Sequence, residues 1–102
     1  MRRRGVLADR YGKVASVGKP ESTLLHVLRG SSDANVSFAD VCALLRHLGF
    51  DERIRGSHHI FAKEGILEIL NLQPRGAKAK PYQVKQVRQV IVRYRMAGES
   101  DE

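Results

Sequence analysis

The sequence predicts an α+β domain in which two helices cover one face of a three-stranded antiparallel sheet and leave the other face free. Two observations predict this fold class. Apolar residues recur at intervals of three and four over 37–48 and again over 82–94, as on amphipathic helices. Between these segments lie three short runs rich in Ile, Leu and Phe, which glycine-containing turns separate. The expected order is therefore helix, strand, strand, strand, helix.

The predicted helix over 37–48 has both of its ends marked in the sequence. Ser37 and Asp40 have the spacing of a capping box, and Gly49 follows the last apolar residue as a C-terminal cap. Its apolar stripe consists of Phe38, Val41, Leu44, Leu45 and Leu48. Cys42 lies between these core positions, so we expect it to be a small core or boundary residue.

The expected strands run over 50–55, 57–63 and 66–72, as an antiparallel meander with turns at Gly56 and at Glu64-Gly65. A loop over 71–80 then leads to the second core helix. One side of that helix is apolar, and its other side carries basic and amide side chains.

Four segments follow from these patterns. We expect a flexible basic arm over 1–20, a short helix and linker over 21–36, the compact domain over 37–96 and an acidic tail over 97–102. The short helix adds an N-terminal element to the core pattern.

The charge of the chain predicts a polyanionic partner. The 102 residues include 18 Lys and Arg against 11 Asp and Glu, for a net charge of +7. The compact domain alone has eleven basic and five acidic residues, so about +6 belongs to the folded part. Nucleic acid is favoured over a membrane surface, because no basic helix carries bulky lipid-seeking residues.

Size and composition exclude several other classes. A domain this small buries only about 60 to 68% of its unfolded surface, which disfavours a large enclosed substrate cavity. A single cysteine excludes an intrachain disulfide, and no apolar run approaches the roughly 18 to 20 residues of a membrane span. We therefore expect a soluble cytoplasmic protein.

The densest polar cluster is RIRGSHHIF, which contains Arg53, Arg55, Ser57, His58 and His59. Arginine forks bind phosphate oxygens, and an imidazole exchanges a proton near neutral pH. These groups suffice to cleave RNA, because the ribose 2′-OH attacks the adjacent phosphate once a base removes its proton. No metal ion or other cofactor is needed.

Strand geometry leaves the roles of the two histidines open. Successive strand residues face opposite sides, so His58 and His59 cannot both point at one site, and either or both can be purely structural. A zinc site is disfavoured because the two rings diverge and no third ligand lies at a useful spacing in the sequence. We expect no metal site.

The chain resembles the HicA toxin family of bacterial toxin–antitoxin systems. The resemblance rests on the helix end LRHLGF, on RIRGSHHIF and on a closing helix rich in Gln, Lys and Arg, and it covers about 60 residues. It implies a fold like a double-stranded-RNA-binding domain, cleavage of messenger RNA and hetero-oligomer formation with a HicB-like antitoxin. It also implies that the catalytic histidine is the one after Gly-Ser, His58, with His59 as the second candidate.

The sequence departs from the family pattern in two places. Many relatives close the third strand with Pro and His, whereas this chain has no His between Glu68 and Gln83. Gln73, Arg75 or Lys78 are the candidates to take over that role. The chain also has about 36 residues ahead of the core helix, where simple members have almost none.

The leading hypothesis is thus a metal-independent ribonuclease toxin. The expected RNA-binding residues are Arg53, Arg55, Ser57, Lys63, Lys78, Lys80, Lys85 and Arg88. A noncatalytic RNA-binding module of the same fold is the main alternative, since basic loops and a basic helix suffice to bind double-stranded RNA by shape. An interaction protein that only binds an acidic antitoxin is a third possibility.

Overall fold

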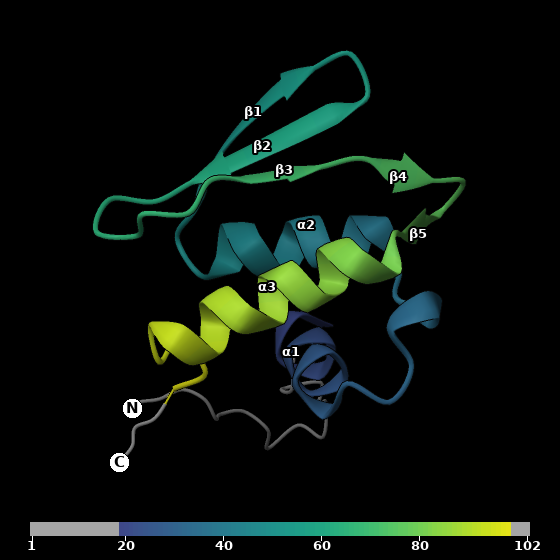
Figure 1. Ribbon diagram of the computed structural model, residues 1–102, viewed down its shortest axis with the longest axis horizontal. Helices are drawn as coiled ribbons and strands as arrows, with labels where there is room; N and C mark the ends of the chain where they lie inside the picture. The colour runs from purple at the N-terminus through teal and green to yellow at the C-terminus, as the bar shows by residue number, and fades with distance from the viewer. Residues whose placement is uncertain (1–18, 99–102) are drawn as a thin grey trace, which may run out of the picture.

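The computed structural model describes residues 19–98 of the chain (Figure 1). Its elements are α1 (Lys19–Arg29), the 3-10 helix η2 (Asp33–Asn35), α2 (Phe38–His47), β1 (Asp51–Arg55), β2 (His58–Ala62), β3 (Leu70–Leu72), β4 (Pro74–Arg75), β5 (Lys78–Ala79) and α3 (Pro81–Arg93). Residues 1–18 of the predicted basic arm and 99–102 of the predicted acidic tail lie outside the described part.

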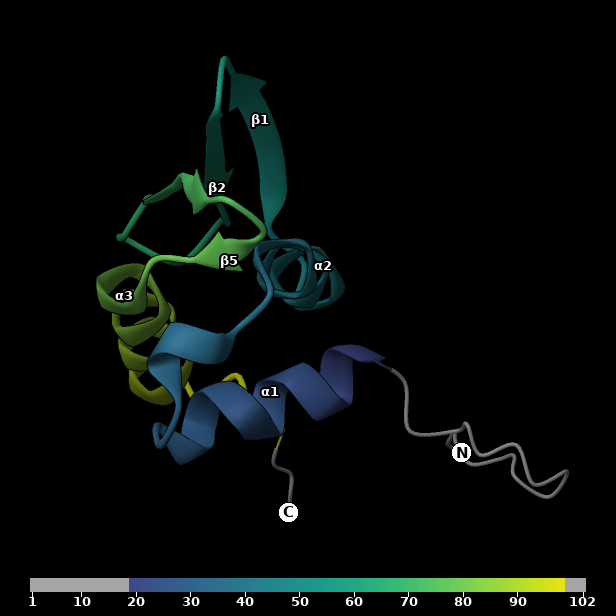
Figure 2. The ribbon, with the colours of Figure 1, turned by 90° about the vertical axis from the view of Figure 1, so that its right-hand side faces the viewer.

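The predicted α+β fold class is confirmed. Strands β1, β2 and β3 form an antiparallel sheet with β2 in the centre, and α2 and α3 lie against one face of it (Figure 1). Helix α1 packs below these two helices, on the side away from the sheet (Figures 1 and 2). Within residues 19–98, no helix covers the other face of the sheet (Figure 1).

Helix α2 forms where its caps and apolar stripe predict it. The Ser37 side chain accepts a hydrogen bond from the Asp40 backbone N–H at 3.2 Å, which satisfies one donor of the first turn. The helix ends at His47, and Gly49 then adopts a positive φ of 96°, a conformation that L side chains rarely adopt.

The core lies between the helices and the covered face of the sheet. Phe61 of the central strand is fully buried, and Leu70 and Leu72 of β3 are buried beside it. Val84, Val87 and Ile91 of α3 and Leu44 and Leu45 of α2 close this core from the helix side. Each such side chain stabilises the fold by about 1.5–3 kcal/mol relative to exposure.

The third strand is shorter than predicted, because residues 66–69 do not pair with β2. The Tyr94 hydroxyl accepts a hydrogen bond from the Leu67 N–H at 3.2 Å and donates one to Glu68 at 2.7 Å. These contacts with the end of α3 hold the segment as a loop, and Leu67 and Ile69 are exposed on it. Pairing begins only at Leu70.

The segment expected as a loop over 71–80 contains the hairpin β4–β5, which the sequence did not predict. It turns at Gly76, which has a positive φ of 58°. The Ala79 N–H donates to the Val36 carbonyl at 2.8 Å, and the Phe38 N–H donates to the Ala77 carbonyl at 3.0 Å. The hairpin is therefore fixed to the backbone that leads into α2.

Helix α1 begins at Lys19, two residues earlier than predicted, so the end of the predicted arm is helical. Pro20 is tolerated there because the first turn of a helix does not use its N–H groups. The predicted linker over 30–36 contains η2, and Asp33 of η2 forms a double ion pair with Arg88 of α3 at 2.9 and 3.0 Å. Arg88 also donates to the Val27 carbonyl of α1 at 3.1 Å.

Candidate functional site

His58 and His59 are the first two residues of β2, directly after the β1–β2 turn. The β4–β5 hairpin and the first turns of α2 and α3 lie at the same end of the molecule as this turn (Figures 1 and 2). Gly56, with a φ of 59°, makes the tight turn that places Arg55 opposite His58. Because β2 is antiparallel to both neighbours, its first residues also lie beside the last residues of β3.

His58 is exposed on the free face of the sheet, beside Arg55. Its Nδ1 lies 2.9 Å from the side-chain oxygen of Asn71 on β3. Asn71 pairs with Ile60, which is two residues further along β2 than His58. When Nδ1 donates to Asn71, the neutral ring presents Nε2 as a proton acceptor. Asn71 therefore fixes the ring in a form suited to general-base chemistry, a role that the sequence patterns did not suggest for it.

A chain of polar contacts joins the β1–β2 turn to the start of α3. Gln73 donates to the Ser57 hydroxyl at 2.8 Å and accepts a hydrogen bond from the Lys80 ammonium group at 3.2 Å. The buried amide of Gln83 in turn accepts a hydrogen bond from the Gln73 backbone N–H at 3.1 Å. Gln73, one of the three residues expected to replace the missing histidine, thus lies within the polar cluster.

His59 points to the opposite face, toward α2, as strand alternation predicts. Its Nδ1 lies 2.7 Å from Glu52 Oε2, and its ring packs edge-on against Phe38 with the centroids 4.9 Å apart. Arg46 holds the other Glu52 oxygen at 2.8 Å. His59 is only 23% exposed, which makes it much less accessible than His58.

Two groups beside His59 have shifted pKa values. Partial burial alone raises the pKa of Glu52, but the hydrogen bonds from His59 and Arg46 outweigh it and leave the pKa below its ordinary value. Burial raises the pKa of the Cys42 thiol to about 11. The Cys42 sulfur lies 4.0 Å from His59 Nδ1.

No third metal ligand lies at a useful sequence spacing from the two histidines, but within residues 19–98 the fold brings three potential ligands together. Cys42, Glu52 and His59 come together although they are seven to seventeen positions apart in the sequence. The pairing of Glu52 with His59 follows from the hairpin register, in which Glu52 and Ile54 face the helices together with His59. This register is the sequence signal that would have identified Glu52, whereas Cys42 depends on how α2 packs.

The predicted RNA-binding cations are not all at this end. Arg53 and Arg55 lie on the free face of the sheet, and Lys78, Lys80 and Lys85 lie on β5 and on α3 or its cap. Lys63 follows the far end of β2, about 16 Å along the strand from His58, and its ammonium group contacts Gly49. The Arg88 guanidinium group donates hydrogen bonds to the Asp33 carboxylate and to the Val27 carbonyl.

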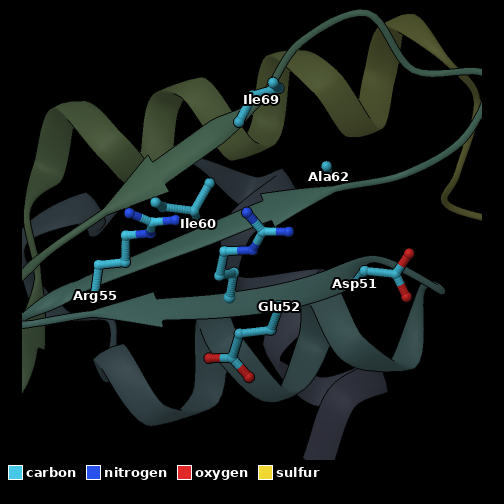
Figure 3. Close-up of a pocket in the computed structure, with 7 residues that line it drawn as sticks. Asp51, Glu52, Arg55, Ile60, Ala62 and Ile69 are labelled. Atoms are coloured by element: carbon cyan, nitrogen blue, oxygen red, sulfur yellow. The ribbon is translucent and has the colours of Figure 1, made fainter.

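The free face of the sheet is hollowed between Arg53, Arg55, Ile60 and Ile69. Figure 3 shows Arg55 and Ile60 on this face, while Glu52 points from the other side of β1. The hollow is open rather than enclosed, as expected for a domain of this size.

The arrangement of helix, three strands and helix around these histidines corresponds to a known family. A family model described as the HicA toxin of bacterial toxin–antitoxin systems matches residues 38–92, more than half of the chain. The chain belongs to the HicA toxin family. The match runs from the first residue of α2 into the last turn of α3, so the resemblance stated from the sequence is confirmed.

Helix α1 and η2 lie outside the matched HicA region. Neither the curated proteins nor the solved structures yield a match to this chain. Within residues 19–98, no helix of this HicA-family protein has the length and apolar character that spanning a membrane requires.

Proposed function

We propose that this HicA-family protein is a ribonuclease toxin that cleaves messenger RNA in the cytoplasm, with His58 as its general base and acid. The observation that carries the proposal is the exposed imidazole of His58, which Asn71 orients and Arg55 accompanies. Membership of a toxin family supports the biological role.

The proposed chemistry transfers protons without a metal ion. His58 Nε2 takes the proton of a ribose 2′-OH, and the resulting oxygen attacks the adjacent phosphorus. The bond from phosphorus to the 5′ oxygen breaks, the protonated His58 returns its proton to the leaving 5′ oxygen, and a 2′,3′-cyclic phosphate remains. Arg55 and Lys80 are the cations best placed to hold the charged phosphate oxygens, because both flank the polar cluster.

His59 is a second candidate for the general base. Its contact with Glu52 favours this role, because a carboxylate on Nδ1 holds an imidazole in one tautomer and orientation. Its low exposure and its packing against Phe38 favour His58.

The decisive experiment measures cleavage of a messenger RNA in excess chelator by the purified full chain. His58→Ala is expected to slow cleavage by about 10²–10⁴-fold, since that is the contribution of positioned proton transfer. His47→Ala is the matched control, because His47 is an exposed histidine in the last turn of α2. Circular dichroism verifies that each variant is folded.

Full activity of the His58→Ala protein would contradict the assignment, and loss of cleavage only in His59→Ala would transfer it to the second histidine. Tight RNA binding without cleavage by folded wild-type protein would instead favour a noncatalytic RNA-binding module. Neither binding nor cleavage would favour a protein that only engages an antitoxin.

The proposed partner is a HicB-like antitoxin, which forms a hetero-oligomer with the toxin. Family membership in toxin–antitoxin systems supports this partner. Expression of the chain alone is expected to arrest growth and deplete messenger RNA, and co-expression of the antitoxin encoded beside it should restore growth. Growth arrest that persists with the antitoxin bound would contradict neutralisation of the toxin by this partner.

A further inference from the structure

A cluster of three different donor types lies between α2 and the β1–β2 hairpin, on the opposite side of β2 from His58. It consists of the Cys42 thiol from α2, the Glu52 carboxylate from β1 and the His59 imidazole from β2. Their ligand atoms all lie within 4.8 Å of one another. Three separate secondary-structure elements therefore converge on one point.

The spacing of these donors is close to that of a tetrahedral zinc site. Zinc binds sulfur at about 2.3 Å and nitrogen or oxygen at about 2.0–2.2 Å, which separates neighbouring ligand atoms by roughly 3.3–3.6 Å. Cys42 Sγ lies 4.0 Å from His59 Nδ1, and Glu52 Oε2 lies 2.7 Å from the same nitrogen. Zinc binding would have to shorten the first of these separations and lengthen the second by about half an ångström each.

The surroundings of the cluster also suit a metal ion. Arg46 bonds Glu52 Oε1 and leaves Oε2 directed at His59, and Phe38 packs against the edge of the His59 ring. Such outer contacts orient the ligands of metal sites. A surface hollow lined by Phe38, Cys42 and His59 and by the β4–β5 hairpin gives access to solvent, which provides a water molecule as fourth ligand.

We propose that Cys42, Glu52 and His59 bind one zinc ion, with water completing a tetrahedral site. Zinc displaces the thiol proton of Cys42, which is released to solvent, and the neutral His59 ring carries its single proton on Nε2, so that Nδ1 binds the ion. The bound ion joins α2 to the β1–β2 hairpin and stabilises the folded state, since the unfolded chain does not bring these donors together. This site goes beyond the proposed function and does not depend on it.

The test uses the purified full chain without a histidine tag and cobalt(II) as a spectroscopic substitute for zinc. One equivalent of cobalt should produce a thiolate-to-cobalt charge-transfer band and the visible bands of tetrahedral coordination, and zinc should displace it. Equilibrium dialysis should show one zinc per chain. Added zinc should also raise the melting temperature.

Cys42→Ala should abolish the charge-transfer band. Glu52→Gln should weaken zinc binding by about tenfold or more, because even the loss of a residue that only orients a metal ligand costs about tenfold in affinity. His47→Ala and His58→Ala are the controls and should bind zinc like the wild type, because neither belongs to the cluster. No retained zinc in the wild type, or a cobalt spectrum that Cys42→Ala leaves unchanged, would overturn the proposal. Neither measurement involves RNA, so the result is independent of whether the protein cleaves it.

Discussion

At the scale of single residues, Glu52 connects β1 to both β2 and α2. Glu52 is 13% exposed and holds two partners at once, His59 at 2.7 Å and Arg46 at 2.8 Å. It thereby links the two strands of the hairpin to the last turn of α2. A partly buried carboxylate with two charge-assisted hydrogen bonds contributes to stability mainly through its ionised form.

Glu52→Gln is expected to lower the free energy of unfolding by about 1–3 kcal/mol at pH 7 in the presence of chelator. The pKa of Glu52 is below its ordinary value of 4.5 in the folded protein, so its contribution is fully present above that pH. It is lost as the pH falls through the lowered pKa, and the difference between the two proteins should shrink there. Urea unfolding at several pH values measures this, and a difference independent of pH would contradict it.

The candidate site was partly predictable from sequence at this scale. The motif RIRGSHHIF pointed to Arg55, Ser57 and His58, and the structure places all three around the turn at Gly56. Asn71 was not found, because its contact with His58 depends on the β2–β3 register, in which Asn71 pairs with Ile60. Cys42 was recognised as a core residue, but its proximity to His59 follows only from the packing of α2.

At the scale of elements, local signals decided which predictions succeeded. Helix α2 was predicted to within a residue because Ser37 and Gly49 mark its ends. Hairpin β4–β5 was not predicted, because the segment PRGAKA lacks the alternation of apolar and polar residues that is typical of a strand. Its pairing is instead supported by backbone hydrogen bonds to residues 36–38, which are distant in sequence.

The ion pair between Asp33 and Arg88 adds to the attachment of helix α1 to the HicA core, beside the buried packing of Val27. Asp33→Asn is expected to cost about 1–2 kcal/mol, because it weakens the double contact with Arg88, which also holds the Val27 carbonyl. The hydrogen bond from Arg88 lowers the pKa of Asp33 below 3.8, so the effect should disappear as the pH falls through that lowered value.

Hydrogen exchange measures the attachment of α1 directly. Amide protons of residues 19–29 should exchange faster in Asp33→Asn, while those of β2 should change little. Glu21→Gln is the control, because its partner His47 is half exposed and such surface pairs contribute little. Equal acceleration in α1 and β2 would show that the ion pair stabilises the whole domain and not one helix.

At the scale of the whole molecule, the fold separates a stabilising side from a basic end. The helix layer encloses the core, and within it the Arg88 side chain pairs with Asp33. Arg55, Lys78 and Lys80 instead lie at the end of the molecule that carries His58. Net charge alone predicted a polyanionic partner, but only the fold shows which cations gather around the histidine. Lys63 and Arg88 were expected among them and lie elsewhere, because strand direction and helix packing move them away.

The proposed RNA surface predicts a defined salt dependence. Arg55→Gln should reduce the slope of log affinity against log salt concentration by about 0.7–0.9, since one phosphate contact is lost. Arg93→Gln is the matched control, because Arg93 pairs with Glu68 at the far end of α3. Titrations of RNA at several salt concentrations measure the slopes, and an equal reduction in both variants would argue for a diffuse charge effect.

The adjacency of His58 and His59 gives the protein two built-in spectroscopic probes. The rings are one peptide bond apart in the chain, yet one faces solvent on the free side of the sheet and the other faces α2. Their NMR signals can therefore be recorded in a single spectrum and read separately. RNA should perturb the first ring and zinc the second, so each ligand has its own signal within the same molecule.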